Sequence, residues 1–414
     1  MVNTVNINMP KDVKFIIATL EKAGFEGYAV GGCVRDAILG RQPQDWDITT
    51  SALPGQIKEL FPRTVDTGIQ HGTVTVMMGR NGYEVTTFRI DGEYEDMRHP
   101  KSVEFSKNLR EDLKRRDFTI NAMAYNDKAG LVDEFGGRND LKEGVIRCVG
   151  EATERFSEDA LRMMRAIRFA SQLGFTIEKD TWDAIVRLAP NIGRVSRERI
   201  AVELGKTLMS DRPEYVQLYS KCNIASVVLM QLDKALSDKS STLALATARI
   251  SSKKLPLRYA AFMNQQDADS TRALLTGLKL DNNTVRLTTM LVENVGLQIE
   301  PSECSVRWAL NRFGKDNLLL ILENQENIIL AKEQVIGMPL GNARNHIGRL
   351  RTMIDLIVRR GDCYTIAGLA VTGNDIMALG FTGPAVGKKL NELLEMVIEN
   401  PEMNNRQTLL SIQK

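Results

Sequence analysis

The sequence lacks the features that mark membrane, secreted or zinc-binding proteins. It contains no run of about 18 apolar residues, so we expect no membrane-spanning helix. Its first residues, MVNTVNINMPKDV, have no basic stretch followed by an apolar core, which argues against a secretory signal. The five cysteines are scattered without a C-x-x-C pair, so neither a disulfide framework nor a zinc site is indicated. These absences predict a cytoplasmic protein.

The sequence also has almost no excess of charge of either sign. Lysine and arginine number 54 against 52 aspartates and glutamates, for a formal net charge of +2. Net charge therefore does not announce a nucleic-acid partner, whose phosphates would have to meet a local basic surface. Nothing in the sequence indicates an obligate protein partner.

The length and the hydrophobic pattern divide the chain into a mixed first part and a helical remainder. A chain of 414 residues favours roughly two to four domains. The segments 71–79 (HGTVTVMMG) and 83–90 (YEVTTFRI) alternate as strands do, and Asn81-Gly82 between them predicts a hairpin turn. From about residue 150 onward the spacing is helical almost to the end, as in 158–175. Residues 91–100 (DGEYEDMRHP) are polar and are predicted to form a loop.

Two aspartates one residue apart suggest a metal site. If QDWDIT (44–49) is a strand, Asp45 and Asp47 project from the same face. Two carboxylates on one face repel each other unless a cation lies between them, and Mg²⁺ prefers one or two carboxylates together with phosphate oxygens. Glu84, in the predicted hairpin, is our candidate for a third carboxylate, although a plain surface glutamate explains it equally well.

A glycine turn precedes this aspartate pair. Gly31 and Gly32 follow a short predicted strand and open a helix, whose first backbone N–H groups can bind phosphate. Arg35, one turn into that helix, adds a guanidinium. Each motif alone is more often structural than catalytic, but their order along the chain favours nucleotidyl transfer from a nucleoside triphosphate.

Six ordered motifs now give the sequence a specific resemblance. They are GGxVRDxxLG with DxD, HGT, FRxDGxYxDxRHPxxVxF, RRDFTxNAxA (115–124), EDxxRxxRxxRF (158–169) and RERIxxELxK (197–206). In this order they resemble the bacterial class II CCA-adding enzymes, tRNA nucleotidyltransferases of the polymerase-beta-like superfamily, to which bacterial poly(A) polymerases also belong. The motifs cover residues 28 to about 206, half of the chain.

The resemblance implies an α+β fold with a catalytic head followed by an all-α neck, body and tail. We expect the head at 1–148, a neck with the nucleotide-selecting pocket at 149–210, the body at 211–330 and a tRNA-binding tail at 331–414. The implied reaction is template-independent addition of CCA to the 3′ end of tRNA from CTP and ATP with Mg²⁺, releasing pyrophosphate. It implies metal ligands at Asp45 and Asp47, and nucleotide contacts at Gly32, Arg35, Arg116, Asp159, Arg162, Arg165 and Arg168.

The residues of EDALRMMRAIRF support this assignment independently. On a helix, Asp159 and Arg162 are three residues apart and share a face, which Arg165 and Arg168 extend. Cytosine and adenine each present an amino donor beside a ring-nitrogen acceptor, so one carboxylate next to one guanidinium matches both edges. Guanine and uracil present the opposite order, so both contacts fail, and each good bidentate contact discriminates by about 1–3 kcal/mol.

Several alternatives remain open at this point. Asp117 is expected to support Arg116 by an ion pair or to cap the following helix, and Arg199 and Glu203 are expected to pair along one helix. The chain lacks the G-R-R-F-R sequence of poly(A) polymerases and carries the complete DGEYEDMRHP segment that CC-adding enzymes lack. Full CCA addition is therefore preferred over A-only addition or poly(A) synthesis. An RNA-binding protein without catalytic activity is the alternative from a different class.

Overall fold

The computed structural model describes residues 5–92, 103–228, 230–237 and 241–412. These residues form two compact units, Met1–Ser237 with Gly277–Lys279 and Asp238–Thr276 with Leu280–Lys414. The expected head and neck both belong to the first unit, the expected body is divided between the two, and the expected tail belongs to the second. Most of the predicted loop at 91–100 lies outside the described residues.

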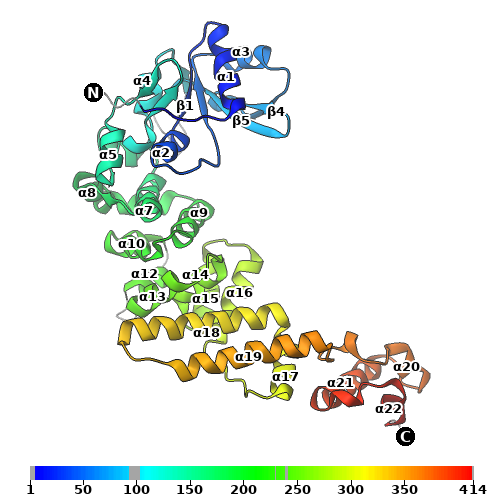
Figure 1. The fold of residues 1–414 in the computed structure, drawn as a ribbon. Coiled ribbons are helices and arrows are strands. Elements are labelled where there is room, and N and C mark those ends of the chain that lie inside the picture. The colour runs from blue at the N-terminus through cyan, green and yellow to red at the C-terminus, as the bar shows by residue number, and fades with distance from the viewer. Residues whose placement is uncertain (1–4, 93–102, 229, 238–240, 413–414) are drawn as a thin grey trace. The chain divides into compact units, whose positions relative to one another are not determined.

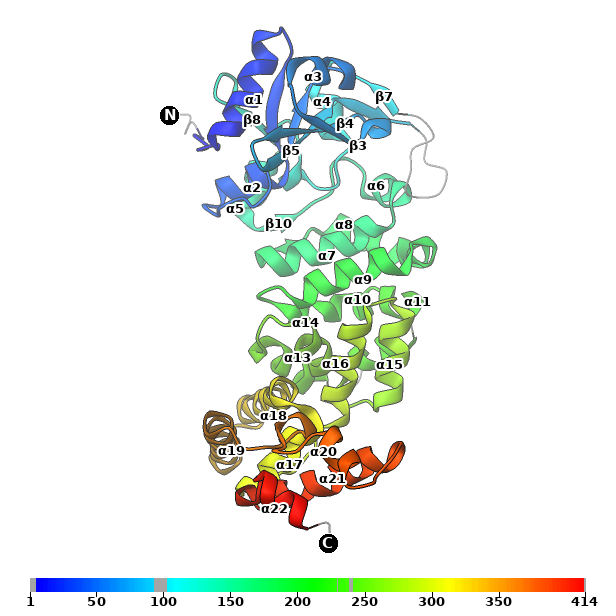
Figure 2. The ribbon, with the colours of Figure 1, turned by 90° about the vertical axis from the view of Figure 1, so that its right-hand side faces the viewer.

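The first unit is built on a mixed sheet of seven strands, which confirms the α+β class (Figures 1 and 2). The strand order is β3-β4-β5-β2-β1-β8-β9, and the β2–β5 pair is parallel. The strands are β1 (Gly27–Val30), β2 (Ile48–Thr50), β3 (Thr64–Gly68), β4 (Thr73–Met78), β5 (Asn81–Thr87), β8 (Ala124–Asn126) and β9 (Gly130–Val132). Two small pairs accompany them, β6 (Arg89–Asp91) with β7 (Val103–Phe105) and β10 (Val145–Ile146) with β11 (Thr176–Ile177).

The predicted hairpin is present, but its turn comes two residues earlier than expected. Met78 pairs with Asn81, so Gly79 and Arg80 form the two-residue loop. Gly79 has a φ of +63°, a conformation that this type of turn requires and that glycine adopts without steric penalty. Gly82 instead lies within β5, opposite Met77.

The strand predicted for QDWDIT is shorter than expected, because β2 begins only at Ile48. The preceding residues nevertheless show the alternation of a strand, since Trp46 is buried while Asp45 and Asp47 on either side are exposed. The backbone N–H of Val30 in β1 donates to the carbonyl of Asp47 over 3.0 Å and holds this segment against the sheet. Asp45 and Asp47 are both exposed, and the projection of their carboxylates from one face stays a prediction.

Twelve helices complete the described part of the first unit. Of these, α1 and α3 pack on the sheet, and α7 lies beside α9 (Figures 1 and 2). They are α1 (Lys11–Lys22), α2 (Gly32–Ile38), α3 (Pro54–Leu60), α4 (Leu109–Lys114), α5 (Gly137–Glu143), α6 (Ala152–Glu158), α7 (Leu161–Leu173), α8 (Lys179–Leu188), α9 (Arg197–Leu208), α10 (Gln217–Lys221), α11 (Ile224–Val228) and α12 (Met230–Ser237).

The helix predicted over 158–175 is interrupted, which corrects one expectation about the candidate site. Glu158 ends α6, and Asp159 follows in an extended conformation with a φ of −141°. Its carboxylate accepts a hydrogen bond from the backbone N–H of Leu161 over 3.0 Å, at the first residue of α7. An aspartate can satisfy a free N–H at a helix start in this way, and a helix boundary here is therefore stable. Asp159 and Arg162 do not share one helix.

The described residues of the second unit are helical. One core joins α17, α18 and α19, and another lies among α20, α21 and α22. The helices are α13 (Ser241–Ile250), α14 (Leu255–Met263), α15 (Ala268–Gly277), α16 (Asn282–Glu293), α17 (Glu303–Phe313), α18 (Lys315–Ile336), α19 (Gly341–Arg360), α20 (Gly373–Ala378), α21 (Pro384–Glu399) and α22 (Arg406–Ser411). In neither unit does a helix within the described ranges have the length and apolar character needed to cross a bilayer.

A packing contact in the first unit leads to a stability prediction. A Cβ added at Gly137, the first residue of α5, would lie 2.2 Å from the carbonyl oxygen of Thr119. We expect Gly137→Ala to lower the free energy of unfolding by about 2 kcal/mol, because overpacking forces the backbone to shift. Gly55→Ala is the matched control, since a Cβ there meets no atom within 4 Å. Urea denaturation of both variants tests this, and equal midpoints would contradict the packing argument.

Candidate active site

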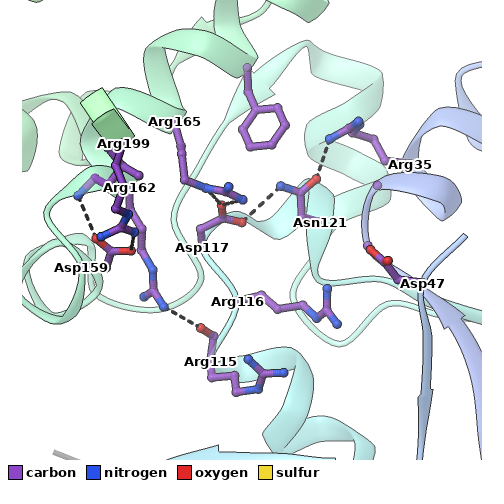
Figure 3. A pocket seen from close by; sticks show the side chains of 14 residues that line it. Arg35, Asp47, Arg115, Arg116, Asp117, Asn121, Asp159, Arg162, Arg165 and Arg199 are labelled. Carbon is purple, nitrogen blue, oxygen red and sulfur yellow. Dashed lines mark hydrogen bonds and ion pairs between the residues drawn. The ribbon is translucent and has the colours of Figure 1, made fainter. Parts of the chain in front are cut away.

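A cavity of about 490 Å³ lies in the first unit, between the glycine turn, the segment 115–121 and the helices α7 and α9 (Figure 3). Six arginines and three aspartates are among its lining residues, so it is suited to an anionic ligand with several charges. The lining residues are Gly31, Gly32, Arg35, Asp47, Arg115, Arg116, Asp117, Asn121, Asp159, Leu161, Arg162, Arg165, Phe169 and Arg199.

Of the three predicted acidic residues, Asp47 lines this cavity, whereas Asp45 and Glu84 are not among its lining residues. Ile48 of β2 pairs with Val85 of β5 in parallel register, which places Glu84 beside Asp47. Desolvation raises the pKa of Asp47; Arg116 opposes this rise and Asp45 adds to it. Desolvation also raises the pKa of Glu84, and both aspartates add to the rise. The three carboxylates therefore act on one another electrostatically, and a cation placed among them would relieve their repulsion.

These carboxylates fit a hard cation that shares its ligands with a bound phosphate. In the described part of the chain, no three carboxylate, histidine or cysteine side chains are close enough to hold a metal ion alone. Mg²⁺ does not need such a cage, because it commonly uses one or two carboxylates and takes its other ligands from water and phosphate. Carboxylate oxygens at Asp45 and Asp47 are donors of this kind.

The glycine turn is more constrained at its first glycine than at its second. Gly31 has a φ of +82°, and an added Cβ would lie 2.8 Å from Nη1 of Arg116. Gly32, the predicted nucleotide contact, is the first residue of α2 and lines the cavity. Gly31 thus allows Arg116 to approach the backbone closely, a role that the sequence analysis did not assign.

Two arginines stand near this turn. Arg35 is buried, and its Nη1 donates to Oδ1 of Asn121 over 2.7 Å while Nε donates to Asp36 over 2.8 Å. Nη2 of Arg116 lies 3.5 Å from the carboxylate of Asp112. The Nε of Arg116 is buried and has no hydrogen-bond partner among the described residues, so it remains available to an acceptor on a ligand.

Asp117 pairs with α7 and not with Arg116, one of the partners expected from the sequence. Its Oδ2 accepts from Nε of Arg165 over 2.7 Å, and its Oδ1 accepts from Nδ2 of Asn121 over 3.1 Å. Burial alone would raise the pKa of this carboxyl, but Arg165 and Arg162 outweigh it and lower the pKa to about 2. The carboxylate therefore stays charged and fixes the position of α7 against the segment 115–121.

Asp159 and Arg162 line the cavity from different elements. The carboxylate of Asp159 pairs with Nη2 of Arg199 in α9 over 2.8 Å (Figure 3). Arg162 pairs with Glu158 over 2.6 Å and also donates to the carbonyl of Arg115 over 3.2 Å. The pairing of Arg199 with Glu203 expected along one helix is thus replaced by a tertiary pair with Asp159.

The arginines of α7 divide into two groups. Arg165 lines the cavity, as expected, and its guanidinium lies 5.5 Å from the ring centre of Phe169. Arg168 differs from the expectation, since it is 7% exposed and does not line the cavity. It pairs with Glu203 of α9 and lies 3.8 Å from the ring centre of Phe169. Arg168 follows Arg165 by three residues and so continues the same face of α7, but α9 packs on this face and covers Arg168.

Seven lining residues were not predicted as site residues, namely Gly31, Arg115, Asp117, Asn121, Leu161, Phe169 and Arg199. Four of them show what signal the sequence held. Arg115 and Asn121 belong to the RRDFTxN motif, and Arg199 opens the RERI motif, so their motifs were noticed without their roles. Phe169 ends the EDxxRxxRxxRF motif, but it was not singled out because an aromatic residue on a helix is usually a core residue. Only the tertiary fold brings these four side chains to one cavity.

The chain is similar to known proteins over nearly its whole length. The family model described as "Poly A polymerase head domain" matches residues 27–147, and that described as "Probable RNA and SrmB- binding site of polymerase A" matches residues 174–236. The chain is 36% identical to a CCA-adding enzyme of Leuconostoc mesenteroides over 96% of its length and 94% of the relative's. A CCA-adding enzyme of Lactiplantibacillus plantarum is 37% identical with the same coverage.

Solved structures agree with these relatives. The crystal structure of the Bacillus stearothermophilus CCA-adding enzyme in complex with CTP is 32% identical, with a TM-score of 0.75 over 98% of this chain and 97% of the other. The Thermotoga maritima CCA-adding enzyme complexed with tRNA is 20% identical with a TM-score of 0.62, covering 100% of this chain and 96% of the other, which supports the fold alone.

The pKa of Asp117 gives a testable pH dependence. A pKa that falls from 3.8 to about 2 on folding corresponds to about 2 kcal/mol of stability, present above pH 3.8 and lost as the pH falls toward 2. Asp117→Asn should therefore lower the free energy of unfolding at pH 7, and the difference from the unchanged chain should shrink by about half at pH 3. Urea denaturation at both pH values measures this.

A surface pair supplies the control for that measurement. Asp183 pairs with Lys179 on an exposed face, so Asp183→Asn should change the free energy of unfolding little at either pH. If Asp117→Asn lowers the free energy of unfolding equally at both pH values, the charge of Asp117 is not what stabilises the fold.

Proposed function

This chain belongs to the family of CCA-adding enzymes, and we propose that it adds CCA to the 3′ end of tRNA from CTP and ATP, releasing pyrophosphate. The observation that carries the proposal is the polarity of one cavity. Asp47, which Asp45 and Glu84 accompany, stands at one edge, and Asp159 stands among guanidiniums at the other (Figure 3). A nucleoside triphosphate with a divalent metal has the matching polarity, since its phosphates bind the metal and its base presents hydrogen-bonding edges.

At the carboxylate edge, we propose that Asp45 and Asp47 hold Mg²⁺, with Glu84 contributing to the negative field. Bound there, Mg²⁺ would supply activation of the attacking 3′ hydroxyl and stabilisation of the leaving pyrophosphate. Arg35 and Arg116 bind and orient the triphosphate, helped by backbone N–H groups of the turn at Gly32. The unpartnered Nε of Arg116 is suited to this task, because a phosphate oxygen can satisfy it.

At the other edge, we propose that Asp159 and Arg162 read the base, with Arg165 beside them. Arg199 orients the carboxylate of Asp159, so this carboxylate accepts a hydrogen bond from the amino group of cytosine or adenine with little reorganisation. A guanidinium then donates to the neighbouring ring nitrogen. Guanine and uracil place a carbonyl against the carboxylate, which leaves a buried acceptor without a donor.

The relatives favour full CCA addition over the other enzymes that share this head. The relatives identical at 36–37% over nearly their whole length are CCA-adding enzymes. Although one matching model is described by poly(A) polymerase, it covers the head that both groups share. The segment 91–100, which argued against CC-only addition, lies mostly outside the described residues and stays a sequence argument.

The helical parts are proposed to hold tRNA, with the body at 211–330 and the tail at 331–414. The match of residues 174–236 to an RNA-binding model supports RNA contact in the expected neck and the first part of the body. Recognition of a folded RNA by its shape and phosphates suits helices that present basic side chains. We place the reaction in the cytoplasm, where the five free cysteines would remain reduced.

An incorporation assay tests the proposed function directly. Purified protein with Mg²⁺, tRNA lacking its 3′ end and labelled CTP and ATP should extend the RNA by three nucleotides and then stop. Extension by one A alone would indicate an A-adding enzyme, a long A tail would indicate a poly(A) polymerase, and no incorporation would indicate an RNA-binding protein.

Asp47→Asn should lower incorporation about a hundredfold or more, because it removes a metal ligand. Asp66→Asn, an exposed change on β3, is the control and should leave the rate unchanged.

Base selection has its own test. Asp159→Ala should increase the ratio of UTP to CTP incorporation about tenfold or more, since the carboxylate that rejects a carbonyl is gone. Glu154→Gln changes an exposed carboxylate of the adjacent α6 and should leave the ratio unchanged. A faithful Asp159→Ala enzyme would refute the base-edge argument.

A further inference from the structure

A continuous chain of hydrogen bonds links the two ends of the cavity. Nη1 of Arg35 donates to Oδ1 of Asn121 over 2.7 Å, Nδ2 of Asn121 donates to Asp117 over 3.1 Å, and Nε of Arg165 donates to Asp117 over 2.7 Å (Figure 3). Resting on the proposed function, we propose that Asn121 and Asp117 are positioning residues that couple the arginine at the phosphate end to the arginine at the base end, so that both ends of the nucleotide are held as one unit.

The amide of Asn121 can serve only in the observed orientation. Its oxygen accepts from a guanidinium, which has no acceptor to offer, and its nitrogen donates to a carboxylate, which has no donor. Turning the amide over would break both bonds and set donor against donor. Asn121 is 6% exposed, so water does not readily replace either partner. Both neighbours therefore fix its position, and it transmits a shift of either one.

Phe169 gives the same two arginines a common support. The guanidinium carbon of Arg35 lies 5.1 Å from the ring centre and that of Arg165 lies 5.5 Å from it. A cation near an aromatic ring gains from the ring quadrupole, and the ring also keeps the two positive groups apart. Phe169 belongs to α7, so a movement of this helix acts on both arginines.

The buried carboxylate explains why the two ends should influence each other. When a base draws Arg165 toward itself, Asp117 loses part of its compensation and relies more on Asn121, which in turn pulls on Arg35. An uncompensated buried charge is costly, so the network has a strong preference for one arrangement. Coupling of this kind is reciprocal in binding free energy: phosphate contacts at Arg35 would equally favour the position of Arg165 for base contact.

A double-mutant cycle measures this coupling. Arg35→Lys and Arg165→Lys keep the charge but lose the planar set of donors. We expect the Kd for CTP with Mg²⁺, measured by calorimetry without tRNA, to change in the double variant by a factor that differs about fivefold or more from the product of the single effects. In the Asn121→Ala background the effects should multiply to within about twofold. Independent effects in the otherwise unchanged protein would overturn the proposal.

Controls separate coupling from loss of structure. Asn126 in β8 is another buried asparagine of the first unit. It is bonded to Glu21 and Gly27 and lies outside the cavity, so Asn126→Ala should lower stability without altering the non-additivity. Equal loss of non-additivity in both asparagine variants would mean a purely structural effect and would refute the proposal. Should Asn121→Ala fail to fold, the cycle in the unchanged background still decides the question. Absence of CTP binding by the unchanged protein would remove the proposed function itself, whereas binding with independent effects would remove the coupling alone.

Discussion

The ion pair between Asp117 and Arg165 is the interaction on which the cavity depends. It joins the segment after α4 to the middle of α7, and the carboxylate of Asp117 is buried while the guanidinium of Arg165 is partly exposed. A charge buried in this way is stable only when it is paired and hydrogen-bonded, so the pair strongly disfavours other arrangements of helix and segment. With α7 fixed, Phe169 and the glycine turn line one cavity, and Asp47 and Asp159 lie at opposite sides of it (Figure 3).

The cavity also shows how many like charges can be gathered without a ligand. Most of its arginines are held by an acidic partner or a carbonyl: Arg115 and Arg116 by Asp112, Arg162 by Glu158, Arg165 by Asp117 and Arg199 by Asp159. These partners orient the guanidiniums. Hydrogen-bond donors that are already oriented need little reorganisation when a ligand binds. The carboxylates at Asp45, Asp47 and Glu84 are arranged in the opposite way. Desolvation and the charge of Asp45 raise the pKa of Asp47, desolvation and both aspartates raise the pKa of Glu84, and a cation would relieve this repulsion.

The sequence predicted the residues of the site better than their geometry. Motif spacing located Asp47, Arg162 and Arg165, which line the cavity, because the proposed chemistry demands those residue types in that order. It also placed Arg168 there, which is instead buried against α9. It placed Asp159 on the same helix as Arg162, because a three-residue step looks helical whether or not the helix is broken between the two. It paired Arg199 with Glu203 for the same reason, since local spacing cannot reveal that Arg168 and Asp159 compete for these partners from another helix. The sequence predicted the hairpin turn at the wrong position, because Gly79 and Gly82 can both occupy a tight turn. Only the strand register shows that the turn lies at Gly79.

The break at Asp159 changes where base selectivity resides. Had Asp159 and Arg162 shared a helix, their relative position would follow from helix geometry alone. Instead the carboxylate is aimed by Arg199 of α9, and the guanidinium is carried by α7, so the distance between them depends on how α7 packs on α9. The pair of Arg168 and Glu203 lies at that same helix contact and is almost completely buried. If Asp159 and Arg162 read the base as proposed, Arg168 influences which base is accepted without lining the cavity, because its pair with Glu203 helps to set the spacing of those two groups.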